Sequence, residues 1–362
     1  MMDKKYCVIV KTGASELRAM QNLPEKELNK ILPVVELTRG RAKNVGTKQY
    51  PRFTYPYDTK LTKIKEIFKG VQIALDVTSE ESLSSQEIDK LFDHSDGYAN
   101  WTSLLKSLKE EGSNLIPSIL MNYDDEDFEE NLRKQVLGLS SDFSEVMYRC
   151  AIDDEGAVDD VSLISEYLPE NCGLLIILDC GWIPPASYRD PANVCISKIE
   201  QLKETLTTKK YSIAVCATTF PNNVSEIGDD ISDTFDLREI DLYELITKKH
   251  PEVIYGDYGS INPIRNDQIV MARGWIPRID VALEKQIYYY RDRKGAREYS
   301  DTYTSVAKRV VSDSRFPSLI EAWGIRQIEN CALGDAPSAS PSYWISVRMN
   351  SHIMQQIRRL GL

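Results

Sequence analysis

The sequence lacks most of the motifs that mark a known enzymatic chemistry. It holds only three histidines (His94, His250 and His352) and no H-x-H or H-E-x-x-H pattern, which disfavours a zinc hydrolase. Its seven cysteines form no C-x-x-C pair, so we expect free thiols in a reducing compartment rather than a metal site. The G-x-S-x-G elbow of serine hydrolases is also missing.

Long apolar runs are missing as well. No stretch approaches the roughly 18 apolar residues of a membrane span, and the chain begins without a cleavable apolar segment. These absences and the free thiols lead us to expect a cytoplasmic protein with no membrane partner. The residues after the first apolar run match neither the G-x-G-x-x-G pattern nor the P-loop, which disfavours a nucleotide-binding sheet.

Negative charge dominates the chain, although it is unevenly distributed. The net charge of −11 argues against broad electrostatic adhesion to nucleic acid or anionic lipid. Residues 1–70 nevertheless hold 15 Lys and Arg against 7 Asp and Glu, whereas residues 121–170 hold 3 against 15. The basic stretch that contains Arg39 and Arg41 directly follows an apolar run, so it belongs to a loop near the end of a strand.

Eight short apolar runs recur through the first 260 residues, with helix-like segments between them. These segments cover residues 14–30, 59–69, 86–110, 126–137, 158–168, 193–207 and 236–249. The runs cover residues 7–11, 32–36, 71–76, 115–122, 146–149, 174–179, 213–218 and 253–257. Short continuous apolar runs are typical of strands that are buried on both faces, as in a parallel sheet covered by helices. Eight of them predict a (β/α)8 TIM-like barrel over residues 1–260; an open doubly wound sheet is the alternative.

The pattern changes after residue 260. Residues 268–275 and 287–290 read as strands, and residues 296–312, 316–331 and 344–360 have helical spacing. We therefore predict an α+β extension over residues 261–362 that packs against the barrel.

Each apolar run closes on a polar residue. In a (β/α)8 barrel the carboxyl ends of the strands meet at one mouth, where active sites are built. The residues expected there are Lys11, Glu36, Asp76, Asn122, Arg149, Asp179, Thr218 and Asp257.

These strand-end residues suit metal-assisted chemistry on phosphate esters. Carboxylates are the preferred ligands of Mg²⁺ and Mn²⁺, and we assign the metal to Asp76, Asp179 and Asp257. The expected catalytic residues are Lys11, Glu36, Arg149, Asp179 and Asp257, with the cations neutralising phosphate charge. Substrate contacts would come from Arg39, Arg41, Asn122 and Tyr258. The alternative for each acid is a structural ion pair; for Lys11 this is a salt bridge to Glu36 or Asp257.

Several short segments together resemble the "beta protein" family of phages and bacteria. They include the opening strand that ends in Lys11, Glu16-Leu17-Arg18-Ala19, Pro33-Val34-Val35-Glu36, the Arg149 strand, Leu178-Asp179, Tyr255-Gly256-Asp257-Tyr258, Trp323-Gly324-Ile325, Trp344-Ile345-Ser346-Val347-Arg348 and His352. The resemblance implies a barrel-type protein that is often encoded near mobile elements and phage-defence genes. It names no reaction.

Two functions therefore stay open. The first is a metal-dependent hydrolase of phosphate esters, such as a phosphodiesterase or nuclease, that acts on a nucleotide or nucleic acid in phage-host conflict. The second is a catalytically silent barrel that binds a partner protein through aromatic patches at Tyr50–Tyr57 and Tyr288–Arg291. The hydrolase needs strand-end acids that are not all neutralised by basic partners, whereas the binding protein needs exposed aromatic side chains.

Overall fold

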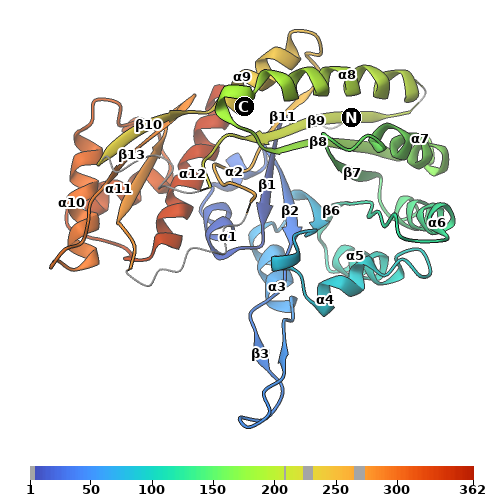
Figure 1. Ribbon diagram of the computed structural model, residues 1–362, viewed down its shortest axis with the longest axis horizontal. Coiled ribbons are helices and arrows are strands. Elements are labelled where there is room, and N and C mark those ends of the chain that lie inside the picture. Colours follow the sequence, from blue (N-terminus) through green and yellow to red (C-terminus); the bar gives the residue numbers. More distant parts are fainter. Residues whose placement is uncertain (1–4, 208, 223–230, 265–273) are drawn as a thin grey trace.

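Eight parallel strands form the centre of the molecule (Figure 1). The computed structural model describes residues 5–207, 209–222, 231–264 and 274–362. The central strands are β1 (Tyr6–Lys11), β2 (Leu32–Leu37), β5 (Gln72–Val77), β6 (Asn114–Pro117), β7 (Glu145–Ala151), β8 (Gly173–Trp182), β9 (Tyr211–Thr218) and β11 (Ile254–Asp257). Each overlaps one of the eight apolar runs of the sequence, so the prediction of eight strands is confirmed. The run at 115–122 was drawn too long, because β6 ends at Pro117 and Asn122 lies in the loop beyond it.

The strands close into a barrel. Their order is β6-β5-β2-β1-β11-β9-β8-β7, and each neighbouring pair is parallel. The ring is completed by a single bridge between Ser118 and Met147, beside which the Ile119 amide donates to the Met147 carbonyl at 2.7 Å. The fold is therefore the predicted (β/α)8 TIM-like barrel, and the open doubly wound sheet is wrong.

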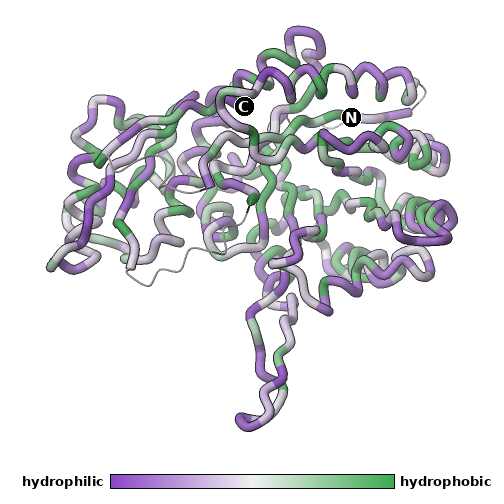
Figure 2. Tube along the Cα trace, viewed as in Figure 1, coloured by the Kyte–Doolittle hydropathy of each residue, from purple (hydrophilic) through white to green (hydrophobic). Residues whose placement is uncertain are grey.

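The strands are apolar on both faces because each face is covered. One set of side chains, including Ile9, Val34 and Ile177, fills the barrel interior. The alternate set, including Val8 and Val35, packs with the helices in a larger core. Figure 2 shows the result: hydrophobic strands lie inside, and the helices around them carry hydrophilic stretches.

The helices between the strands follow the predicted segments. They are α1 (Ala14–Gln21), α2 (Glu25–Leu28), α3 (Asp58–Ile67), α4 (Gln86–Asp89), α5 (Ala99–Glu110), α6 (Phe128–Ser140), α7 (Ala157–Tyr167), α8 (Arg189–Thr205) and α9 (Arg238–Thr247), with 3-10 turns η1 (Glu81–Leu83), η2 (Lys90–Phe92) and η3 (Pro185–Ser187). Residues 86–110, which we expected as one helical stretch, are interrupted because Gly97 and Tyr98 adopt positive φ angles of 67° and 59°.

A hairpin leaves the barrel after β2. Its two short strands, β3 (Lys43–Asn44) and β4 (Phe53–Thr54), pair antiparallel and project away from the body (Figure 1). We call residues 39–57 the arm. Its base is anchored where the Arg39 amide donates to the Leu83 carbonyl at 2.9 Å and the Tyr55 amide donates to Glu87 at 3.2 Å.

A second sheet lies beside the barrel. Its strands are β10 (Ser232–Asp236), β12 (Arg278–Ala282) and β13 (Gln286–Arg291), in the order β10-β13-β12. Helices α10 (Tyr299–Ser312), α11 (Trp323–Ala332) and α12 (Pro341–Arg359) complete this part of the molecule. Because β10 lies between β9 and α9 in the chain, the second sheet takes one strand from within the barrel sequence.

The sequence anticipated this part less well. The three C-terminal helices and the strand at 287–290 are confirmed, although α11 begins only at Trp323. Of the strand expected at 268–275, residues 268–273 lie outside the described residues, and residues 274–275 are not in a strand. β10 and β12 were not predicted. No helix among the described residues has both the length and the apolar character that crossing a membrane requires.

Candidate functional site

The polar ends of the barrel strands face the mouth because side chains alternate along a strand. Cys7, Ile9 and Val34 point into the barrel, so residues two positions further along their strands point the same way. The strand register sets Lys11 beside Glu36 and Glu36 beside Asp76. Three consecutive strands thus bring one cation and two carboxylates to the same level of the mouth.

Arg149 on β7 is the centre of this group. Its Nη1 donates to Glu36 Oε2 at 3.0 Å and to Asp76 Oδ2 at 3.1 Å. Its Nε and Nη2 lie 2.9 and 2.7 Å from Asp179 Oδ2. The Tyr258 hydroxyl donates to Asp179 Oδ1 at 2.5 Å and lies 3.5 Å from Arg149 Nη2. We call Glu36, Asp76, Arg149, Asp179 and Tyr258 the Arg149 cluster.

Burial and charge shift the pKa values of this cluster. Burial raises the pKa of Asp76, and the Glu36 carboxylate adds to the rise, although Arg149 opposes it. Burial acts to lower the pKa of Arg149, but Asp179, Glu36 and Asp76 outweigh it and hold that pKa well above its usual value. Burial and Asp179 also raise the pKa of Tyr258. The guanidinium is therefore permanently charged, and the tyrosine stays protonated.

Lys11 lies at the rim of the cluster. Its Nζ is 3.8 Å from Glu36 Oε1 and donates to the Pro263 carbonyl at 3.1 Å. This is the salt bridge to Glu36 that the sequence left open as an alternative. The side chain of Arg149 is 18% exposed and that of Glu36 only 5%, so little of the cluster contacts solvent.

The carboxylates of the cluster could serve a divalent cation only by changing partners. Glu36, Asp76 and Asp179 are all hard oxygen donors and converge on one point, which fits Mg²⁺ or Mn²⁺. That point is occupied by the guanidinium of Arg149. Within the described part of the chain, no three His, Cys, Asp or Glu side chains are arranged around an open metal position.

Asp257 lies on the opposite face of its strand, outside the Arg149 cluster. Its carboxylate accepts hydrogen bonds from Tyr6, Tyr255 and the Gly259 amide at 2.8–3.0 Å, and His352 Nε2 lies 2.8 Å away. Burial acts to raise the pKa of Asp257, but His352 and the hydrogen bonds bring it below the usual value. The group therefore links β11 to α12.

The expected substrate-binding residues are dispersed. Tyr258 belongs to the Arg149 cluster, whereas Asn122 pairs with His94 at 2.8 Å. Arg39 lies at the base of the arm with its guanidinium 4.8 Å from the Tyr55 ring centre, and Arg41 is exposed on the arm.

The two predicted aromatic patches differ in exposure. On the arm, Tyr50 is 74% exposed and Phe53 is 53% exposed. In β13, Tyr288 and Tyr289 are completely buried and form part of the second sheet's packing. Of the two predicted patches, the arm is therefore the one that exposes aromatic rings to a partner.

The sequence did not predict the hydrogen-bonded group around Asp257, because we did not assign each strand residue to the inner or the outer face of the barrel. Ile254 and Tyr258 face the interior, so Asp257 must face outward, and Tyr6 and Tyr255 meet it there. Counting alternate positions along β11 from Tyr258 would have given this result. The buried His352 of α12 was noted in the sequence, but no local pattern indicated its aspartate partner.

Comparisons with known proteins place the chain in a family. Two solved structures are weakly similar: the spore cortex-lytic enzyme SleL of Bacillus megaterium QM B1551 (12% identity, 84% of this chain and 68% of that chain, TM-score 0.33), and the biosynthetic arginine decarboxylase SpeA of Campylobacter jejuni (8% identity, 99% and 56%, TM-score 0.38). Values this low carry no argument about function.

Sequence similarity is stronger. The chain is 27% identical over 360 residues to "Protein beta" of Enterobacteria phage P4, which covers 97% of this chain and 92% of the relative. The family profile described as Beta protein matches residues 6–358. The chain therefore belongs to the Beta protein family.

Proposed function

We propose that this protein binds a polyanionic partner through the arm and that the barrel is the rigid support of the arm. The observation that carries the proposal is the composition of residues 39–57. They contain five basic residues and no Asp or Glu, in a chain whose net charge is −11. A positively charged segment on a negatively charged protein attracts a partner with a row of negative charges to that segment.

The state of the barrel mouth supports binding rather than chemistry there. The three carboxylates of the Arg149 cluster share one guanidinium, and Lys11 lies beside Glu36. Groups that are already paired and mostly buried are poorly placed to attack a substrate. Similarity to a phage protein supports the further proposal that the binding serves phage-host conflict.

Retention on heparin tests the proposal. In the arm variant, four exposed cations are replaced by Gln: Arg41, Lys43, Lys48 and Arg52. In the control variant, four exposed lysines of the barrel helices and loops are replaced by Gln: Lys26, Lys63, Lys69 and Lys248. Both variants lose the same charge. We expect the arm variant to elute at clearly lower salt than the control variant. Equal elution of the two would refute the proposal.

Metal-assisted hydrolysis of phosphate esters is the second candidate. The observation in its favour is the convergence of Glu36, Asp76 and Asp179 on one point. A metal ion that binds only the folded protein raises its melting temperature by mass action. This candidate predicts such a rise with Mg²⁺ or Mn²⁺, its loss on chelation, and its absence in Asp179→Asn. No rise in the wild type would leave polyanion binding as the remaining function.

A further inference from the structure

We infer that the polyanion held by the arm is single-stranded nucleic acid. This inference rests on the function proposed above and adds the class of partner. Three properties of the arm lead to it: its cations, its two exposed aromatic rings (Tyr50 and Phe53) and its projection from an acidic body.

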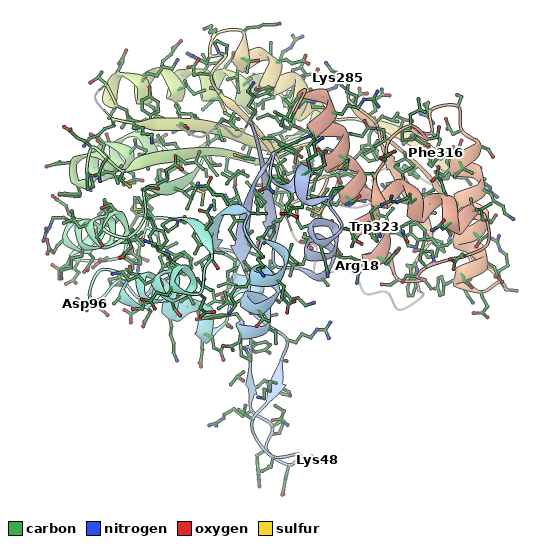
Figure 3. The ribbon with its side chains drawn as sticks, turned by 180° about the vertical axis from the view of Figure 1, so that it is seen from behind. Arg18, Lys48, Asp96, Lys285, Phe316 and Trp323 are labelled. Atoms are coloured by element: carbon green, nitrogen blue, oxygen red, sulfur yellow. The ribbon has the colours of Figure 1, made fainter. Side chains whose placement is uncertain are left out.

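The cations are distributed along the whole hairpin. Arg41 and Lys43 precede the tip, Lys48 lies at the tip, and Arg52 follows it; all four side chains are exposed. Figure 3 shows Lys48 at the far end of the arm, well away from the barrel. None of these four is in an ion pair among the described residues. They are therefore free to contact a chain of phosphates.

Two aromatic rings of the arm, those of Tyr50 and Phe53, have no ring or cation partner among the described residues. Both side chains are largely exposed. Val45 of the same hairpin adds a third exposed apolar side chain, 43% exposed. Unpaired bases have flat faces that stack on such rings, and cations interleaved with aromatic rings are typical of single-strand binding.

The hairpin backbone holds these groups in place. The Asn44 Oδ1 accepts from the Gly46 amide at 2.9 Å and from the Arg52 amide at 3.1 Å, and the Val45 amide donates to the Arg52 carbonyl at 2.8 Å. Gly46 is required there because a Cβ atom would lie 2.3 Å from the Tyr50 carbonyl oxygen. The rings and cations are thus presented by an ordered turn.

Other polyanions match the arm less completely. A duplex keeps its bases stacked inside, so it would leave Tyr50 and Phe53 in water. An acidic protein segment would pair with the cations but supplies no row of flat faces. A stiff duplex that extends past the arm would also meet a body rich in carboxylates, whereas a flexible single strand can follow the hairpin alone.

Fluorescence anisotropy tests the inference with labelled oligothymidine of about 15 nucleotides and a duplex of the same length. We expect the single strand to bind more tightly than the duplex. If four cations contact phosphates, this binding should weaken roughly 50-fold when the salt concentration rises from 50 to 200 mM. Replacing Tyr50 and Phe53 by Leu should weaken it at least about 5-fold per ring while leaving the salt dependence unchanged.

A second reporter does not depend on loss of binding. In Tyr50→Trp, stacking of a base on the new indole should quench its emission when oligothymidine is added, and heparin should not quench it. Equal binding of single strand and duplex, or binding unchanged by the Leu substitutions, would overturn the inference. If heparin retention still depends on the arm cations in that case, the proposed function stands and the inference about single strands fails. If neither oligonucleotide binding nor heparin retention depends on the arm, both the proposed function and the inference are overturned.

Discussion

At the scale of single residues, Arg149 decides the electrostatics of the barrel mouth. Three carboxylates from three strands approach one guanidinium, and most of the cluster is removed from water. A buried charge pair adds little stability compared with an apolar pair of the same shape. Removal of one partner, however, leaves the other charges buried and unpaired, which is strongly destabilising.

Arg149→Ala should therefore lower the free energy of unfolding by about 3–5 kcal/mol at pH 7. Urea unfolding measures the change. The loss should shrink at pH 5, because the carboxylates left behind can take up protons. Arg133→Ala is the matched control: this exposed arginine forms an ion pair with Glu130 on the same helix, and its removal should change stability little. A similar effect of the two substitutions would contradict this account.

Glu239 makes stability depend on pH in the neutral range. It is almost fully buried, accepts from the amide and hydroxyl of Thr219 at 3.2 and 2.5 Å, and has one carboxylate oxygen without a hydrogen bond in the described structure. Burial raises its pKa to about 7. In the unfolded chain the value is about 4.3. Its contribution to stability is thus complete below about pH 4.3 and is lost as pH rises through 7.

Glu239→Gln removes this titration while keeping an acceptor for Thr219. Relative to wild type, the variant should gain roughly 2–3 kcal/mol of unfolding free energy between pH 5 and pH 8. Chemical denaturation at the two pH values measures the gain. Asp257→Asn should show the opposite pH dependence, because the pKa of Asp257 is lowered in the folded protein. The variant should be less stable than the wild type at neutral pH, and this difference in unfolding free energy should shrink as pH falls below about 4. A pH-independent difference for Glu239→Gln would show that the carboxyl group is not protonated in the folded protein.

At the scale of elements, the eight barrel strands were predictable because each is a short apolar run buried on both faces. β10 (Ser-Asp-Thr-Phe-Asp) has no such run, since it gains its place by pairing with β13 in another part of the chain. β3 and β4 have two residues each, too few to form a pattern. Strands such as β10, which form by pairing with a distant segment, and strands as short as β3 and β4 could therefore not be predicted from the local sequence.

The candidate site was predictable to the extent that strand ends converge. Lys11, Glu36, Asp76, Arg149 and Asp179 do meet at the mouth. Asp257 does not, because one position along a strand reverses the face of the side chain. Apolar residues on both faces of β11 hid this parity. Nor could the sequence reveal that Arg149 would reach all three acids.

The contact between α11 and α12 depends on a glycine. A Cβ atom at Gly324 would lie 2.3 Å from the Val347 carbonyl oxygen. Gly324→Ala should force the helices apart and lower the free energy of unfolding by about 1–3 kcal/mol. Gly138→Ala in α6 is the control, because its nearest neighbour would be 3.7 Å away. It should stabilise by about 0.5–1 kcal/mol through helix propensity. Thermal unfolding of both proteins measures the contrast, and equal shifts would disprove the close-contact explanation.

At the scale of the whole molecule, α12 connects the barrel to the second sheet. His352 pairs with Asp257 of β11, and the Asn350 amide group donates to the Ala19 carbonyl at 3.2 Å. On the other side, Gln355 donates to the Ala282 carbonyl at 3.1 Å. One helix therefore belongs to the packing of both parts.

Barrel and second sheet should consequently unfold together. We expect a single calorimetric transition whose measured enthalpy equals the van't Hoff enthalpy. A chain that ends at residue 340, and so lacks α12, should lose the cooperative transition of the barrel as well. Two separate transitions in the full chain would show instead that the parts are independent.

The closure of the barrel has a mechanical consequence. Between β6 and β7 the backbone makes only the Ser118–Met147 bridge and the adjacent Ile119 hydrogen bond, so the ring has a seam there. Arg149 lies on β7, on one side of that seam, and bonds Asp76 and Glu36 of β5 and β2 on the other side, while Asp179 of the neighbouring β8 fixes its position. Side-chain charges therefore join strands that the backbone connects with few hydrogen bonds. We expect any ligand or substitution that moves the guanidinium away from these carboxylates to loosen the closure of the barrel as well.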